Sequence, residues 1–301
     1  MITSGLLYVD KPAGMTSHDV VSVVRRAARS KRVGHAGTLD PFATGLLVLA
    51  VNSATRLLPY VVGEPKVYDA VIRFGFETDT DDRTGDVTRE AMSPPAELLA
   101  DAGASPLCDA IAALTGRVAQ VPPAFSAKHV NGERAYAMAR RGEVVELPPV
   151  EVHVLGWEWL ASTPDSLTVR ITCGGGTYIR ALARDLGRAL GSAAHCESLR
   201  RMASGAAHVA DATTLEQLEP GSILEGRVLL RSPLSALGAI AHESLDEPGL
   251  AALRVGRRIP AMKPGERGAL LWHDTVVAIA ERVSGDWWQP RVVMLGDEAS
   301  A

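Results

Sequence analysis

The sequence has few of the residues that build disulfide scaffolds or metal sites. Its 301 residues include three cysteines, Cys108, Cys173 and Cys196, and none of them forms a C-x-x-C pair. An odd number of scattered cysteines predicts ordinary thiols and no zinc site. Long apolar runs are also missing: residues 46–51 fall far short of the ~20 residues that cross a bilayer, and no signal-peptide pattern is present. We therefore expect a folded protein of the cytoplasm.

The chain also lacks the positive charge that is typical of proteins which hold nucleic acid by bulk electrostatics. Its formal net charge is -4, and this balance alone favours a small-molecule enzyme. The local distribution differs, because no acid lies between Asp19 and Asp40 whereas basic residues accumulate there. The basic run consists of Arg25, Arg26, Arg29, Lys31 and Arg32. Such a run can be a solvated helix face or a phosphate-binding surface, and its position before Asp40 strengthens the second interpretation.

Familiar cofactor fingerprints are absent as well. The sequence contains no dinucleotide-binding glycine pattern, no P-loop and no defensible serine, histidine and aspartate order. Residues 78–86 are acidic and rich in turn formers, and they could mimic a calcium loop. They lack the spacing to a terminal glutamate and the flanking helices of an EF-hand. We therefore expect an exposed loop there, without a metal.

The feature most indicative of chemistry is the loop at residues 34–45, which reads GHAGTLDPFATG. Glycine and proline breakers surround one histidine, His35, and one carboxylate, Asp40, directly before an apolar strand. This arrangement is typical of a rigid loop that presents a single acid. An aspartate before proline is often only structural, because it caps local backbone amides. The basic run, Tyr68 and Arg180 together favour a catalytic role for Asp40.

Hydrophobic periodicity predicts alternating strands and helices. Strands are expected at residues 6–9, 46–51, 67–75, 152–159 and 167–173. Helices are expected after a cap at Thr16 or Ser17, at residues 98–114, and from the glycines at 174–176 to Gly191. An inserted arm is expected at about residues 120–147, with a short helix at 134–141. From residue 233 onward, a helix at 249–255 and strands at 269–272, 276–283 and 291–295 predict a separate small β domain.

Two tyrosines stand beside cations in a chain that has only 5% aromatic residues. Tyr68 follows Lys66 on a predicted strand, and Tyr178 precedes Arg180 at a predicted helix start. A ring next to cations can stack an extruded base and hold the adjoining phosphates. Packing at the rim of a core is an equally good explanation for each ring. In the same helix, Arg180, Arg184 and Arg188 recur at i, i+4 and i+8 and place three guanidinium groups in a row.

Several segments together resemble the bacterial tRNA pseudouridine-55 synthases of the TruB type. They occur in the family's order over about the first 200 residues, and their combination is far more specific than any one motif. The matching segments are DKPxGxTSxDVV at residues 10–21, GHxGTLDPxAxG at 34–45, KxY at 66–68, PPxxSA at 122–127, GTYIR at 176–180 and LRR at 199–201.

The resemblance implies an α+β fold with a central, mainly antiparallel mixed sheet flanked by helices. It implies a catalytic domain at residues 1–232, and residues 233–301 resemble a small PUA-type module in size and β pattern. The implied activity converts one uridine in the T-arm of tRNA, at position 55, to pseudouridine. All atoms are retained, so no cofactor and no metal are expected. The expected partner is tRNA, and nothing demands more than a monomer.

The resemblance also implies roles for individual residues. Asp40 is the catalytic carboxylate, acting on either the base or the sugar. Arg180 pairs with Asp40 and favours its ionised form. Tyr68 stacks on the flipped base and assists removal of the C5 proton. The implied substrate-binding residues are His35, Tyr68, Tyr178, Leu199 and Lys11, and the expected phosphate contacts are Arg25, Arg26, Lys31, Arg32 and Lys66.

One segment departs from the family pattern. The usual order Ser-Ala-x-Lys-x-x-Gly reads Ser-Ala-Lys-His-Val-Asn-Gly at residues 126–132, with Lys128 one place early and His129 at the lysine position. In an extended arm such a shift turns the side chain to the other face, and His129 could make RNA affinity depend on pH. Two other functions stay open: an RNA-binding or tRNA-folding protein without catalysis, and a nucleoside or glycoside hydrolase. The hydrolase would need a second positioned carboxylate or a metal, for which the sequence offers no convincing candidate.

Overall fold

The computed structural model describes residues 4–61, 63–126, 129–130, 133–134, 138, 141, 143, 147–238, 240–283 and 285–295. Nearly half of the arm expected at 120–147 lies outside the described residues, including Lys128 and most of the helix expected at 134–141, and the side chain of His129 is not described either. The chain forms two compact units. Unit 1 comprises Met1–Pro41, Gly45–Gly63 and Ser204–Ala301, and unit 2 comprises Phe42–Thr44 and Glu64–Ala203.

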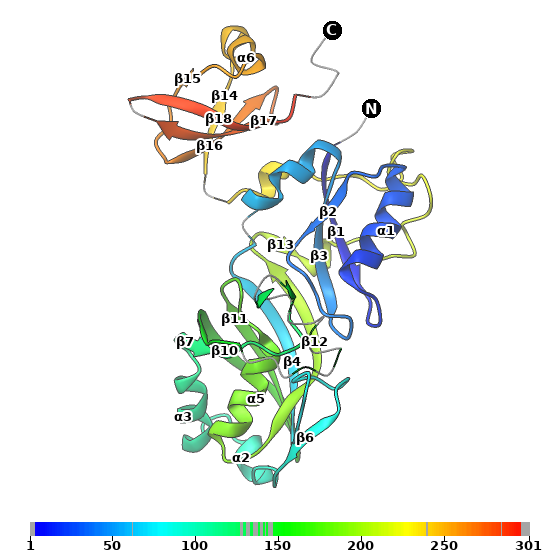
Figure 1. Ribbon diagram of the computed structural model, residues 1–301, viewed down its shortest axis with the longest axis vertical. Helices are drawn as coiled ribbons and strands as arrows, with labels where there is room; N and C mark the ends of the chain where they lie inside the picture. The colour runs from blue at the N-terminus through cyan, green and yellow to red at the C-terminus, as the bar shows by residue number, and fades with distance from the viewer. Residues whose placement is uncertain are drawn as a thin grey trace. The chain divides into compact units, whose positions relative to one another are not determined.

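The N-terminal part of unit 1 is built on β3 (Thr44–Val51), which pairs antiparallel with β1 (Gly5–Lys11) and β2 (Val33–Ala36). Helix α1 (Ser17–Ala28) connects β1 to β2, and η1 (Asn52–Tyr60) follows β3 (Figure 1). The predicted cap is confirmed: the Thr16 hydroxyl accepts from the backbone N–H of Asp19, whose carboxylate accepts from the backbone N–H of Thr16. This reciprocal pair satisfies two helix-end donors and sets where α1 begins.

The C-terminal part of unit 1 is a five-stranded sheet with one helix, α6 (Glu247–Arg254). Its strand order is β14 (Ala241–Ser244), β16 (Arg267–Trp272), β17 (Thr275–Val283), β18 (Trp287–Val293) and β15 (Ile259–Pro260). Leu253, Leu270 and the fully buried Trp288 belong to its apolar core. The strands and helix predicted after residue 233 are therefore confirmed, whereas the domain boundary at that residue stays a prediction.

The sheet of unit 2 runs in the order β12 (Ala194–Ser204), β4 (Lys66–Phe74), β11 (Ser166–Cys173), β10 (Val150–Thr163) and β7 (Gly116–Gln120). The pairs β4 with β11, β11 with β10 and β10 with β7 are antiparallel. Strand β4 shows the predicted alternation, with Tyr68, Ala70, Ile72 and Phe74 buried. The period-two pattern places these side chains on one face of the strand.

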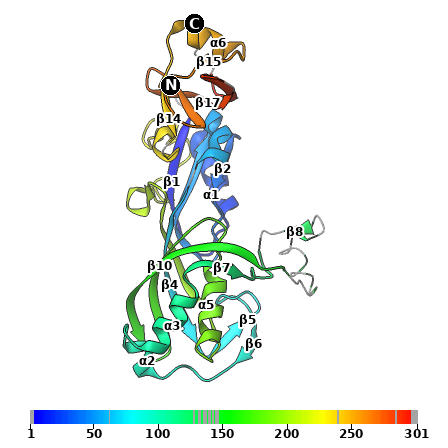
Figure 2. The same ribbon diagram turned by 90° about the vertical axis from the view of Figure 1, so that its left-hand side faces the viewer.

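Three helices form a layer on this sheet: α2 (Ala96–Ala100), α3 (Ser105–Ala113) and α5 (Ile179–Ala189) (Figures 1 and 2). Helix α5 contacts β4 and α3, and α2 contacts β10. The single helix predicted at residues 98–114 is wrong, since two helices occupy that stretch. The Asp101 carboxylate accepts from the backbone N–H of Gly103 in a turn that ends α2, and Pro106 lies in the first turn of α3.

Short pairs complete the described elements, and the sheet topology confirms the predicted α+β class. A hairpin joins β5 (Phe76–Thr78) to β6 (Val87–Glu90), and β8 (His129–Val130) pairs with β9 (Glu133–Arg134). The strand β13 (Ala207–His208) and the helices η2 (Val209–Asp211) and η3 (Pro233–Ala236) are also short. Antiparallel pairs predominate among the described strands, and β14 pairs with β16 in parallel. Among the described residues, no helix combines the length and the apolar character needed to cross a membrane.

Candidate active site

The loop that carries Asp40 is held on both sides of this residue by the turn before α1 and by the first residue of that helix. The Ser17 hydroxyl accepts from the backbone N–H of Leu39 at 2.9 Å and donates to the Leu39 carbonyl at 3.1 Å. The backbone N–H of Gly14 donates to the Pro41 carbonyl at 2.8 Å. Asp40 is half-buried between these two attachments. The loop therefore presents its carboxylate from a backbone with little freedom to move.

Lys11 strengthens the same attachment. Its side chain is fully buried, and its ammonium donates to the carbonyls of Pro12 at 2.9 Å, Met15 at 2.8 Å and Pro41 at 3.4 Å. An ammonium has three donors and no acceptor, so three backbone acceptors match its capacity. Lys11 therefore helps to hold the loop, and the substrate contact expected from the sequence stays a prediction.

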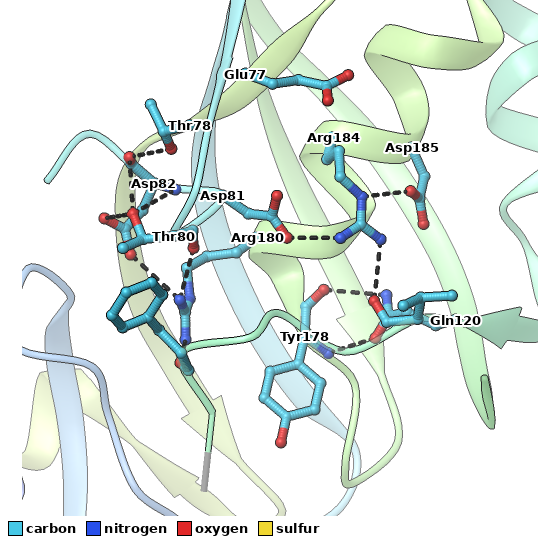
Figure 3. Close-up of polar contacts among 12 residues, drawn as sticks. Glu77, Thr78, Thr80, Asp81, Asp82, Gln120, Tyr178, Arg180, Arg184 and Asp185 are labelled. Carbon is cyan, nitrogen blue, oxygen red and sulfur yellow. Dashed lines mark hydrogen bonds and ion pairs between the residues drawn. The ribbon is translucent and has the colours of Figure 1, made fainter. Parts of the chain in front are cut away.

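Arg180 lies in the first turn of α5, with its side chain only 4% exposed. Its guanidinium donates to the carbonyls of Thr80 at 2.7 Å and Phe125 at 3.1 Å, and lies 3.4 Å from the Asp82 carboxylate (Figure 3). These partners come from two segments of unit 2, the turn that holds Thr80 and Asp82 and the stretch after β7 that holds Phe125. The guanidinium is thereby oriented by several acceptors. Its predicted pairing with Asp40 would join the two units, and it stays a prediction.

Arg184, one turn further along α5, makes a second buried ion pair. Its guanidinium donates to Asp81 at 2.7 Å, to Asp185 at 2.9 Å and to the Val121 carbonyl at 3.0 Å. Burial raises the pKa of Asp81 to about 6, although Arg184 and Arg180 act in the opposite direction. Desolvation disfavours the charged form of a carboxyl, and here it outweighs the attraction of the arginines.

The third arginine of the row, Arg188, also pairs with an acidic side chain. It donates to Glu77 at 2.9 Å and 2.6 Å, and Arg89 also donates to Glu77, at 2.9 Å. Burial raises the pKa of Glu77, but the interactions with Arg188 and Arg89 lower it by more than burial raises it. The net shift of the Glu77 pKa is therefore downward.

The acidic segment at 78–86 is exposed, as predicted, at Asp79, Arg83, Thr84 and Asp86, but not throughout. Thr78, Asp81 and Asp82 are all buried. Asp81 and Asp82 of this turn, with Glu77 just before it, face the arginines of α5 (Figure 3). Buried charges require partners, and the arginine row supplies them. The three guanidinium groups are consequently held by carboxylates of the protein.

The proposed base-binding residues of unit 2 lie on adjacent elements. Tyr68 is buried on β4, opposite Ile171 of β11. Leu199 is buried on β12, the neighbouring strand of β4. Tyr178 is the N-terminal cap residue of α5, which packs on β4.

The predicted phosphate contacts differ in exposure. Arg26, Lys31 and Arg32 are exposed, whereas Arg25 and His35 are half-buried in the same unit. Lys66 is half-buried on β4, and burial lowers the pKa of its ammonium, with nearby Arg201 acting in the same direction. The exposed members of the basic run have the better access to a phosphate.

Sequence reasoning missed three residues that organise this region. The sequence indicates Ser17 only as a cap for α1. In the structure its hydroxyl bonds to both backbone groups of Leu39, 22 positions further along the chain. Asp82 belonged to a turn expected to be exposed. Gln120 is fully buried, and its side chain bonds to the backbone of Tyr178. The arginine row of α5 was the one available signal, because Arg180 and Arg184 are buried and buried guanidinium groups require acidic partners.

Comparison with family models identifies the chain over most of its length. Residues 25–179 match the model described as TruB family pseudouridylate synthase (N terminal domain). Residues 180–232 match the model described as tRNA pseudouridylate synthase B C-terminal domain. The two matches meet at Arg180, within the first turn of α5.

Curated relatives and solved structures agree with these matches. A tRNA pseudouridine synthase B from Solibacter usitatus is 41% identical over 96% of this chain and 99% of its own length. One from Thermobifida fusca is 44% identical over 98% of this chain and 100% of its own length. A chain in the crystal structure of a Cbf5-Nop10-Gar1 complex shares the fold with a TM-score of 0.71 at 23% identity, covering 98% of this chain and 86% of its own.

Both units contribute to the matched regions, and the Asp40 loop and the start of α5 lie inside the N-terminal model. The relatives extend this match to nearly full length at more than 40% identity. The chain therefore belongs to the TruB family of pseudouridylate synthases.

Proposed function

We propose that this protein converts one uridine of tRNA, at position 55 in the T-arm, to pseudouridine, with Asp40 as the catalytic carboxylate. Family membership and the name shared by the relatives, tRNA pseudouridine synthase B, support the reaction and the substrate class. The observation that most supports Asp40 is the attachment of its loop at Leu39 and Pro41. A nucleophile must be held close to its target, and a backbone restrained on both sides provides that restraint.

The proposed reaction breaks the C1′–N1 glycosidic bond, turns the uracil and forms a C1′–C5 bond. N1 gains a proton and C5 loses one, so that the overall composition of the RNA does not change. A carboxylate can divide such a reaction into two easier steps by forming a covalent intermediate. Asp40 supplies this carboxylate, and the reaction calls for no electron donor or acceptor.

The uracil has to leave its helical stack before a carboxylate can reach it. Extrusion costs a few kcal/mol, which contacts to the flipped base must offset. We assign stacking on the base and assistance with the C5 proton to Tyr68, and the lining of the uridine pocket to Tyr178 and Leu199. His35, on β2 just before the Asp40 loop, occupies space next to the flipped nucleotide. Arg180 pairs with Asp40 and directs its carboxylate.

The exposed basic run of α1 and the following turn is proposed to contact RNA phosphates. Joint neutralisation of Arg26, Lys31 and Arg32 to glutamine should reduce the slope of log Kd against log salt by about 2 to 3, because each lost phosphate contact lowers counterion release by about one ion. The measurement is tRNA binding at several salt concentrations. Substitution of Arg254, Arg257 and Arg258 to glutamine provides a matched triple change outside this run. An unchanged slope in the first variant would make the run a solvated helix face.

The function itself is tested with an unmodified tRNA transcript that carries tritium at C5 of uridine. The proposed isomerisation releases tritium to water from this transcript. A transcript with cytidine in place of the uridine at position 55 releases none. Equal release from both transcripts would contradict the assigned position, and no release from either would contradict the activity.

A further inference from the structure

We propose that Gln120 is a positioning residue, whose side-chain amide holds the backbone of Tyr178 and thereby sets the start of α5 and the place of Arg180. The expected effect on turnover rests on the proposed function. The hydrogen bonds that the proposal describes involve only residues of unit 2. Gln120 ends β7, on a different segment of the chain from α5.

The amide of Gln120 makes two hydrogen bonds to one residue. Its Nε2 donates to the Tyr178 carbonyl at 3.1 Å, and its Oε1 accepts from the Tyr178 N–H at 2.8 Å (Figure 3). The side chain is fully buried. Only this orientation of the amide is compatible with both partners, because the flipped amide would set donor against donor and acceptor against acceptor. The two hydrogen bonds therefore resemble the backbone pairing that a neighbouring β-strand would provide, and together they are called the bracket below.

The position of this bracket matters because Tyr178 begins the helix. Tyr178 is the cap residue of α5 and makes no side-chain capping hydrogen bond. Its carbonyl also accepts from the N–H of Leu182 at 3.1 Å, in the first turn of the helix. Gln120 thus binds the same oxygen that starts the hydrogen-bond ladder of α5. Helix ends need such external partners for their backbone groups.

The bracket lies directly before two further attachments between the same segments. Arg184 donates to the carbonyl of Val121, and Arg180 donates to that of Phe125. Gln120 makes the attachment nearest the start of the helix, and Arg180 follows Tyr178 by two residues, a rise of about 3 Å. Without the bracket, the first turn loses the partner that restrains its backbone. A misplacement of about 1 Å at a catalytic group can reduce turnover about 100-fold.

The charged groups around the bracket are engaged with one another. Arg184 binds Asp81 and Asp185, and Arg180 lies beside Asp82. Gln120 itself is neutral, so a charge introduced at this position is informative. A glutamate has the same shape, and its protonation state decides whether it can reproduce the bracket.

The test is the pH dependence of Gln120→Glu in the full-length protein. A protonated carboxyl has one O–H donor and one carbonyl acceptor, so it can bind both groups of Tyr178. The ionised form has only acceptors and directs one at the Tyr178 carbonyl. Burial raises the pKa of such a carboxyl, which brings the transition toward neutral pH. The ratio of kcat in the variant to kcat in the unchanged protein should rise at least about 10-fold as the pH falls from 8 to 5.5.

Two matched variants accompany this test. Gln120→Met keeps the length of the side chain but removes its donor and acceptor; kcat should fall about 10- to 100-fold at every pH, with the Kd for tRNA changed less than about threefold. Gln217→Glu makes the same chemical change in unit 1, where Gln217 accepts from the Thr214 N–H at 3.0 Å. Its kcat ratio should stay near one across the pH range. Groups that titrate in both the variant and the unchanged protein, such as Asp81, affect both kcat values and therefore cancel in these ratios.

Hydrogen exchange provides a readout that does not depend on catalysis. The amide of Tyr178 and those of the following turn should exchange faster in Gln120→Met, because the Tyr178 N–H loses its acceptor. If the unchanged protein releases no tritium from tRNA, the proposed function fails while exchange still tests the bracket. Unchanged kcat and unchanged exchange in Gln120→Met would overturn the proposal. A flat kcat ratio for a folded Gln120→Glu would overturn it too.

Discussion

Asp40→Asn is expected to abolish turnover while leaving tRNA binding nearly intact. The amide matches the shape of the carboxylate but is a far weaker nucleophile, so tritium release should fall by at least about 1,000-fold. Binding should change by less than about threefold, because phosphate contacts supply most of the affinity for a nucleic acid. The measurements are single-turnover tritium release and the Kd for the same transcript.

Two control variants show whether the loss of turnover is specific to the Asp40 carboxylate. Asp40→Ala excludes slow return of activity through deamidation of the asparagine. Asp165→Asn removes a carboxylate of comparable type, one that pairs with Arg73 at 2.8 Å in a partly exposed turn, and it should retain turnover. Near-normal release by Asp40→Asn and Asp40→Ala would show that another group performs the chemistry.

Arg180→Ala is expected to reduce the rate of the chemical step by at least about 100-fold, with a much smaller change in tRNA affinity. The reason is that the guanidinium is buried, where its interaction with a carboxylate is strong, and is already oriented by Thr80, Phe125 and Asp82. The measurement is single-turnover rate at saturating enzyme, together with the Kd. A defect confined to the Kd would contradict the proposed pairing with Asp40.

The matched control for Arg180→Ala lies two turns further along the same helix. Arg188 has a 54% exposed side chain and binds Glu77, which Arg89 also binds. Arg188→Ala should therefore keep turnover within about threefold, since Glu77 retains one cation. Removal of Arg180 also leaves the buried Asp82 without this cation. The double variant Arg180→Ala with Asp82→Asn should regain stability but not turnover, which separates folding from catalysis.

The sequence predicted those parts of the fold that depend on local patterns. Alternation in β4 and the capping box of α1 are short-range features, and both are confirmed. The helix expected at 98–114 is wrong because its apolar spacing continues across Gly103, where the structure has a turn. Apolar periodicity indicates which face of a helix is buried. It does not reveal a turn after which the next helix buries the same face.

The site was predictable where a motif lies in one segment and unpredictable where partners come from distant segments. Asp40 belongs to a motif within one segment, and the basic run, Tyr68 and Arg180 favoured its catalytic role, but the bonds of Ser17 to Leu39 require the fold. The acids at 81 and 82 read as an exposed turn because their partners, Arg184 and Arg180, follow about 100 residues later. Gln120 carried no signal, since a single glutamine at a strand end has no periodic or charge pattern.

The most direct test of the central claim is product analysis after reaction with a T-arm stem-loop that contains one labelled uridine. With tritium at C5, the unchanged protein should release one tritium per RNA molecule, yield pseudouridine on nuclease digestion and produce no free uracil, whereas Asp40→Asn should do none of this. Free uracil would identify a hydrolase, and tight binding with no release of tritium would identify an RNA-binding protein. Either result would contradict the assignment of Asp40 as the carboxylate of a uridine isomerase.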